Sequence, residues 1–117
     1  MIVVALACEG ALGAPARFLL ERTMTDRLGH GFPWGTTCVN LLGSFALGLV
    51  AGLGEFRSLD HDIARVVAVG FLGAFTTFST FAVESTRLAP GRRIAYVGIS
   101  VIGGIGLAGA GLALASV

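Results

Sequence analysis

The chain has 117 residues, of which 55% are hydrophobic and 13% are charged, and its formal net charge is +1. A soluble domain carries about a quarter charged residues, so this composition predicts a membrane protein. Because a bilayer-spanning helix needs roughly 20 mostly apolar residues, four spans would use the whole sequence. That leaves no length for a soluble catalytic domain or a cofactor-binding fold, and no basic run indicates a nucleic-acid partner.

The first predicted span covers about residues 2–20. It contains two charged residues, Glu9 and Arg17, and a proline, which a helix that only crosses lipid does not need. It lacks a positive leading region and a clear cleavage site, so we interpret it as a retained span rather than a signal peptide. Pro15 is expected to kink the helix or to mark where it leaves the hydrocarbon core. Arg17 then has two interpretations: a snorkelling anchor, or a cation at the mouth of a pore.

A polar loop at 21–35 leads to the second predicted span, about residues 36–54. Asn40 is the notable residue here, because an amide in a bilayer is costly unless it is paired. It could cross-link helices, or it could offer two N–H donors to an anion. Gly48 and Gly52 form a GxxxG pair that allows close helix contact, and we expect such faces to supply contacts between subunits.

The third predicted span, about residues 63–88, follows a loop in which Asp60 is a candidate N-cap. Within this span, residues 70–81 combine two glycines, four phenylalanines and four hydroxyl residues. Phe75, Phe78 and Phe81 recur every three residues and predict an aromatic ridge along one side of the helix. Ordinary packing is the alternative explanation for that ridge.

The span is longer than a straight crossing requires, so it has room for an irregular turn. Gly70 and Gly73 mark a place where the helix could open and leave backbone carbonyls unpaired. We therefore expect a break between about Gly73 and Thr76. Aromatic rings, hydroxyls and freed carbonyls at one depth predict a functional site.

The fourth predicted span, about residues 94–116, is rich in glycine and is expected to pack tightly against its neighbours. Tyr96 and Ser100 supply the little polarity it has. Cys8 and Cys38 lie in apolar segments without metal or disulfide spacing, so we interpret them as small packing residues.

No enzymatic chemistry emerges from the sequence. Ser79 has no histidine partner at membrane depth, because His30 and His61 both lie in predicted loops. An intramembrane hydrolase or transferase would need such a base or paired acids within the spans. The remaining pattern is a narrow polar route of hydroxyls, one amide and phenylalanine edges, and a phenyl edge carries partial positive charge that can face an anion. A bundle of four short helices has little interior, so oligomerisation is expected.

Three segments resemble the motifs of one known family, the CrcB/Fluc fluoride channels. The most specific is Gly-Phe-Leu-Gly-Ala-Phe-Thr-Thr-Phe-Ser-Thr-Phe-Ala-Val-Glu at 70–84. The second is Gly-Thr-Thr-Cys-Val-Asn-Leu-Leu-Gly-Ser-Phe-Ala-Leu-Gly at 35–48, and the first in the chain is Gly-Ala-Leu-Gly-Ala-Pro-Ala-Arg-Phe at 10–18. Their order and spacing cover essentially the whole chain.

The resemblance implies an all-α membrane protein of four transmembrane helices, assembled as an antiparallel dual-topology dimer in the cell membrane. It implies passive export of fluoride that relieves fluoride toxicity. By motif position, Phe78 and Phe81 would line the pore and Asn40 would meet them. Arg17 would lie at an aqueous vestibule. The residues implied for the polar part of the path are Ser79, Thr80 and Glu84.

The resemblance also implies a structural Na⁺ at the centre of the dimer. The backbone carbonyls of Gly73 and Thr76 would hold it, since carbonyls freed by a helix break are suitable hard-oxygen ligands. No organic cofactor is implied.

The chain departs from the family pattern at two places. Glu9 stands where the family usually has glycine, and Gly104 aligns with a serine of the fourth span that commonly reaches the pore. Ser100, one turn earlier, could substitute for that serine. Such departures also fit a non-conducting partner subunit in a heterodimeric channel.

Two alternatives of other classes stay open on sequence grounds. A small multidrug-resistance-type proton antiporter shares the length, the four spans and one acid in the first span, which Glu9 would supply. It leaves Asn40 and the Phe/Thr/Ser cluster unexplained. A membrane assembly subunit would account for the glycine-rich fourth span alone. The arginines favour the first and third loops on the cytoplasmic side, but only modestly, so the orientation stays open.

Overall fold

The computed structural model describes all 117 residues, and every regular element in it is helical. The first two spans are single helices, α1 (Ile2–Leu28) and α2 (Trp34–Phe56). The third span consists of four pieces in sequence: α3 (His61–Arg65), the π-helical segment η1 (Val66–Leu72), α4 (Gly73–Phe75) and α5 (Ser79–Arg87). The last span is α6 (Pro90–Ser116).

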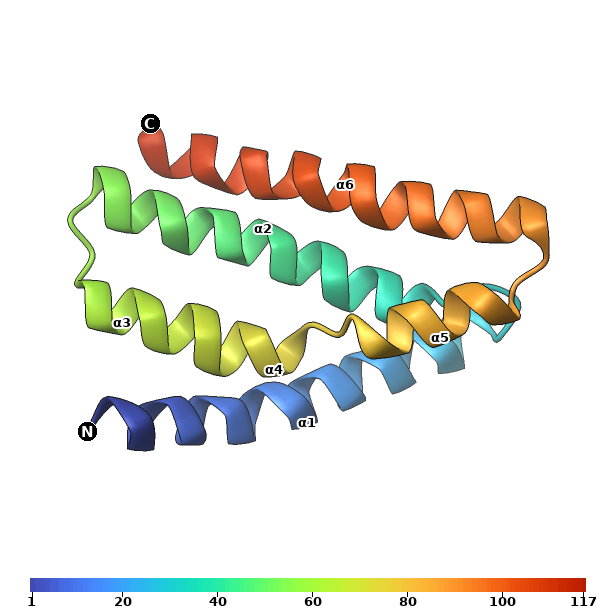
Figure 1. Ribbon diagram of the computed structural model, residues 1–117, viewed down its shortest axis with the longest axis horizontal. Coiled ribbons are helices and arrows are strands. Elements are labelled where there is room, and N and C mark those ends of the chain that lie inside the picture. Colours follow the sequence, from blue (N-terminus) through green and yellow to red (C-terminus); the bar gives the residue numbers. More distant parts are fainter.

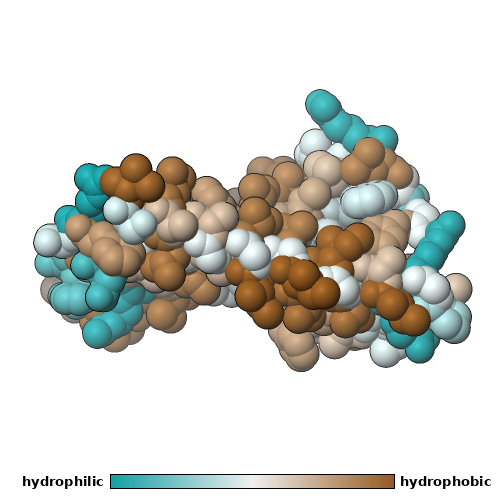
Figure 2. Space-filling model, turned by 90° about the horizontal axis from the view of Figure 1, so that it is seen from above, coloured by the Kyte–Doolittle hydropathy of each residue, from teal (hydrophilic) through white to brown (hydrophobic).

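All four spans are long and apolar enough to cross a bilayer, which confirms the expected all-α membrane fold. Figure 2 shows the corresponding surface, with hydrophilic side chains gathered at the two ends of the molecule and hydrophobic ones between them. Both chain termini lie at the same end of the bundle (Figure 1), as an even number of crossings requires. The protein is a multi-pass membrane protein.

Three helices exceed the ranges predicted for the spans: α1, α2 and also α6, which begins at Pro90 rather than near residue 94. α1 was expected to end near Leu20, yet it continues to Leu28 and passes through Pro15 without ending. Hydropathy marks where apolar residues stop, whereas the Glu and Arg residues that follow are good helix formers. The extension also packs on α2, because a Cβ at Gly35 would lie 2.8 Å from Glu21 Cα. Trp34, expected in a loop, is the first residue of α2.

Helices α2 and α6 run parallel and in close contact, side by side in Figure 1. The GxxxG face of α2 makes this contact: Gly48 lies on the Ala108 backbone, and a Cβ at Gly52 would lie 2.6 Å from Ala115 Cβ. Gly111 of α6 lies in turn on the Phe45 carbonyl. The expectation that this pair supplies contacts between subunits was therefore wrong for Gly48 and Gly52. Small residues here bring two backbones of the same chain together.

Helix α1 pairs in the same parallel sense with the third span. Gly13 lies on the Phe71 carbonyl, and a Cβ at Gly70 would lie 2.8 Å from Glu9 Cβ. The bundle thus consists of two parallel helix pairs, α1 with the third span and α2 with α6.

The third span begins at the predicted cap and breaks slightly later than predicted. Asp60 accepts hydrogen bonds from the backbone N–H groups of Asp62 (2.8 Å) and Ile63 (3.2 Å), which confirms it as the N-cap. Gly73 itself is helical, and the break covers residues 76–78, where Thr76 is extended with φ −84° and ψ 161°. The glycines upstream do not open the helix by themselves; a residue of α2 holds the break, as described below.

We expect the α2–α6 contact to be a large determinant of stability. Gly48→Ala should lower the free energy of unfolding by about 2 kcal/mol, since overpacking a tight contact costs about 1–3 kcal/mol. Gly54→Ala is the matched control, because a Cβ there meets nothing within 4 Å. Unfolding in mixed detergent micelles, followed by circular dichroism, would measure both. Equal stability of the two variants would contradict the described packing.

Candidate functional site

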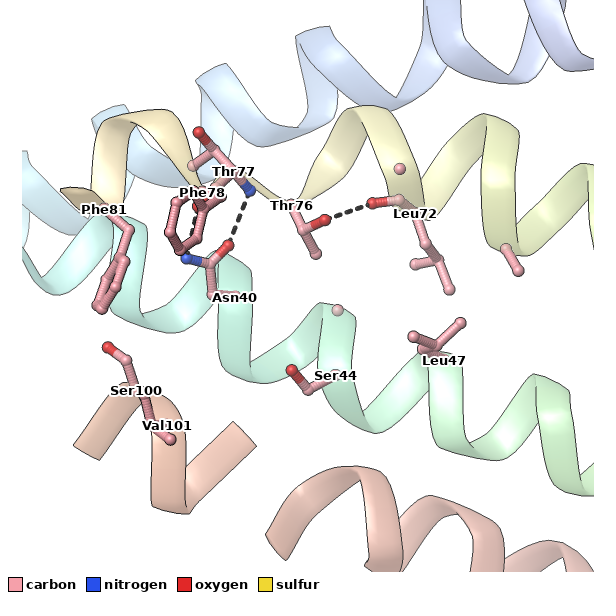
Figure 3. Close-up of a pocket in the computed structure, with 13 residues that line it drawn as sticks. Asn40, Ser44, Leu47, Leu72, Thr76, Thr77, Phe78, Phe81, Ser100 and Val101 are labelled. Carbon is pink, nitrogen blue, oxygen red and sulfur yellow. Dashed lines mark hydrogen bonds between the residues drawn. The ribbon is translucent and has the colours of Figure 1, made fainter. Parts of the chain in front are cut away.

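The site is organised by Asn40 of α2, which binds the backbone of the helix break through both ends of its amide. Its Nδ2 donates to the Thr77 carbonyl at 2.9 Å, and its Oδ1 accepts from the Thr77 N–H at 2.9 Å. Both bonds are drawn in Figure 3. Thr77 is only 7% exposed, so water could not replace these bonds. These two hydrogen bonds, to a residue 37 positions away, offset the free energy of placing the Asn40 amide inside the membrane.

This pairing explains why the helix stays open. In an unbroken helix the Thr77 N–H would bind the Gly73 carbonyl, but it binds Asn40 instead. Likewise the N–H of Thr80 would bind the Thr76 carbonyl, but it donates to Thr77 Oγ1 at 3.2 Å. The carbonyls of Gly73 and Thr76 thus lose their helical partners. Arg17 of α1 donates from one guanidinium nitrogen to the Thr76 carbonyl at 3.4 Å.

A cavity of about 420 Å³ lies beside the break, bounded by α2, the third span and α6. Figure 3 shows amide, hydroxyl and phenyl groups converging on it from these elements. Its lining residues are Asn40, Gly43, Ser44, Leu47, Ala68, Leu72, Gly73, Thr76, Thr77, Phe78, Phe81, Ser100 and Val101. The structure therefore brings Asn40, both phenylalanines and both predicted carbonyl residues to one place.

The predicted aromatic ridge is divided by the break. Phe75 lies before it and stacks on Phe71, with ring centroids 5.7 Å apart. Phe78 and Phe81 lie after Thr77, line the cavity, and have centroids 5.9 Å apart with planes tilted by 44°. Phe78 is 79% exposed in the single chain. The three-residue spacing therefore describes two separate aromatic groups.

Helix α6 contributes Ser100 rather than Gly104 to the cavity lining. The Ser100 hydroxyl is buried and has no hydrogen-bond partner in the chain. A Cβ at Gly104 would lie 3.3 Å from Ser44 Oγ, so the absent side chain faces a hydroxyl on α2. Two serines, one on each helix, thus surround the position at which a fourth-span serine was expected.

A polar path leads from the aromatic rings towards one end of the bundle. Phe81 packs on Tyr96 with ring centroids 5.1 Å apart, and Tyr96 is fully buried. Thr36, 4% exposed, donates its hydroxyl to Glu84 Oε1 at 2.5 Å. Sequence reasoning missed Thr36 and Thr77. The spacing of Thr36 and Asn40, four residues apart on one face of α2, was the signal that could have identified Thr36.

Three of the residues singled out from the sequence lie apart from this cavity. Ser79 and Thr80 begin α5 and are exposed. Glu9 lies at the contact between α1 and η1, next to Gly70. No group of three or more His, Cys, Asp or Glu residues could hold a metal ion. An ion at this site would therefore meet backbone carbonyls, hydroxyls, an amide and phenyl rings.

Comparison with known proteins yields consistent matches over most of the chain. The family model described as "CrcB-like protein, Camphor Resistance (CrcB)" matches residues 4–112. A protein of Solidesulfovibrio magneticus is 46% identical over 114 residues, covering 93% of this chain and 91% of the relative. One from Leptospira interrogans is 43% identical, covering 92% and 88%, and one from Shewanella halifaxensis is 39% identical, covering 90% and 85%. All three relatives are named "Fluoride-specific ion channel FluC".

We expect Asn40→Ala to loosen the helix break. The substitution leaves a buried N–H and a buried C=O of Thr77 without partners, at about 1–3 kcal/mol for each group. Hydrogen–deuterium exchange of the peptide covering residues 76–80 should become faster. Ser44→Ala is the control, because Ser44 lines the same cavity but makes no hydrogen bond to the break. Unchanged exchange in Asn40→Ala would contradict this role of the amide.

Proposed function

The chain belongs to the CrcB-like family, and from that premise we propose that it is a subunit of a fluoride-selective channel. It lets F⁻ leave the cell passively through the cell membrane and so relieves fluoride toxicity. The names of the relatives support fluoride as the conducted ion, and the four apolar spans support a location in the membrane.

The observation that carries the proposal is the cavity at the helix break. It combines hydroxyl groups, one amide and two phenyl rings at membrane depth, and none of its lining residues is charged. Hydroxyl and amide donors can replace the water around a small anion, and phenyl edges add partial positive charge. A fixed cation would bind the ion too tightly, whereas conduction needs binding weak enough to release it.

The geometry refines the role proposed for Asn40. Its Oδ1 and one of its two N–H groups are engaged by Thr77, which leaves one N–H rather than two for an anion. Asn40 thus has two tasks: it holds the break open and points one donor at the path. The buried Ser100 hydroxyl, which lacks a partner, provides another donor, and Thr36 and Glu84 lie further along the same path.

We also propose that a second copy completes the pore, in antiparallel orientation. Phe78 is 79% exposed although it lines the cavity, so the cavity is open at its side in the single chain, and its polar groups need a cover other than lipid. An antiparallel copy places the same helix break at the same depth from both sides of the membrane.

A structural Na⁺ between the two breaks fits the donors that the chain offers. The carbonyls of Gly73 and Thr76 are hard-oxygen ligands without helical partners. Arg17 uses one lone pair of the Thr76 carbonyl, and a carbonyl oxygen has two. The bound ion would supply positive charge that ties the two breaks together.

The antiporter alternative assigned the essential acid of the first span to Glu9. Glu9 lies at the α1–η1 contact, outside the cavity, and no relative described above is named as an antiporter or as a non-conducting partner.

Fluoride efflux from liposomes that contain the purified protein tests the proposal. We expect fluoride flux without a proton gradient and without chloride flux. Phe81→Ile should slow fluoride flux about tenfold or more, equivalent to about 1.4 kcal/mol in the barrier, while the assembly stays intact on size exclusion. Phe56→Ile, at the exposed end of α2, is the matched control. Unaltered flux in Phe81→Ile would remove this ring from the path, and a wild-type protein without fluoride flux would overturn the proposed function.

A further inference from the structure

A second cavity, of about 250 Å³, lies at the end of the bundle where the loop after α1 meets the end of α5. We call it the mouth cavity. It is separate from the cavity at the helix break and shares none of its lining residues. Its polar side chains are Thr25 of α1, His30 of the loop, and Glu84 and Arg87 of α5, and its apolar wall includes Phe32 and Leu88.

Glu84 connects the mouth cavity to the interior of the protein. Its Oε1 accepts the hydroxyl of Thr36 at 2.5 Å, and Thr36 is buried. Tyr96 packs edge-on against Phe32, which lines the mouth cavity, and also packs on Phe81, which lines the first cavity. The mouth cavity therefore lies where the polar path described above reaches the surface.

The charges at this point pose a problem for an anion. Glu84 places a carboxylate at the end of the path, and a carboxylate repels fluoride. Arg87 is the charged residue on the same helix that can offset it, because residues three apart on a helix lie on one face and both line the mouth cavity.

Two arginines of α6 near this end, Arg92 and Arg93, have backbone partners. Arg92 donates to the Gly31 carbonyl at 2.6 Å, and Arg93 donates to the carbonyls of Ser85, Thr86 and Leu88. Arg87 donates no hydrogen bond to the protein and leaves its guanidinium available to the cavity. The Arg92 bond also ties the loop that carries His30 to α6, so the cavity has a defined wall.

We propose that the mouth cavity is a fluoride-binding vestibule in which Arg87 neutralises Glu84 and attracts the anion to the end of the path. This inference rests on the proposed function. Thr25 and His30 supply further O–H and N–H donors to the anion. Arg87 acts through its charge: a positive group at a narrow opening raises the local concentration of anions, and salt in solution screens the effect.

The test measures fluoride efflux from liposomes at low fluoride concentration, with sodium gluconate used to vary the ionic strength. Arg87→Gln should slow efflux about three- to tenfold at low salt, at the lower end of electrostatic steering effects, and the deficit should shrink as salt is raised. Arg87→Lys keeps the charge and should retain most of the flux. Arg27→Gln is the matched control, since Arg27 lies in the last turn of α1 near this end and does not line the cavity.

A double-mutant comparison separates charge from structure. In a Glu84→Gln background there is no carboxylate to offset, so adding Arg87→Gln should cost a smaller fold-change than it does alone. The inference is overturned if wild-type protein conducts fluoride while Arg87→Gln and Arg27→Gln behave alike. It is also overturned if Arg87→Lys loses as much flux as Arg87→Gln, or if the deficit is insensitive to salt. Absence of fluoride flux in the wild type would instead refute the proposed function.

Discussion

The pairing of one side-chain amide with one backbone unit is the interaction on which the rest of the structure depends. Asn40 satisfies both the N–H and the C=O of Thr77, so the third span can leave helical geometry inside the bilayer without exposing those groups to lipid. Because the N–H groups of Thr77 and Thr80 bind elsewhere, the carbonyls of Gly73 and Thr76 lose their helical partners. Thr77 Oγ1 accepts the Thr80 N–H in the first turn of α5. A polar site within an apolar bundle is the result.

The placement of charge follows the same logic. Uncharged side chains line the cavity at the helix break, and the charged side chains nearby lie outside that lining. Arg17 lies at the Thr76 carbonyl, and Glu84 and Arg87 lie at the mouth cavity. A small anion would thus be attracted by charge at the end of the path and solvated by dipoles in the middle.

Local patterns in the sequence predicted the elements and singled out several residues that line the cavity at the break. Hydropathy predicted four spans, the Asp60 cap was predicted correctly, and Asn40 was recognised as an amide that needs a partner. The identity of that partner was not predictable, because a hydrogen bond to a backbone group 37 positions away produces no repeating pattern in the sequence. The break was expected at the glycines, but it occurs where Asn40 reaches the chain. Thr36 lies four residues before Asn40 on one face of α2, but its role depends on Glu84, 48 positions away, so the spacing alone did not reveal what it binds.

The parallel pairing of α2 with α6 has a consequence for how the protein is made. The glycine face of α2 is made before the third span, yet α6, the helix that covers it, is made only after that span. Until α6 is inserted, the backbone at Gly48 and Gly52 is exposed to lipid and can contact any other helix with small residues on its surface. The α2–α6 pair can therefore form only after the third span has been made, and a chain interrupted before α6 would leave this small-residue face open to other helices in the membrane.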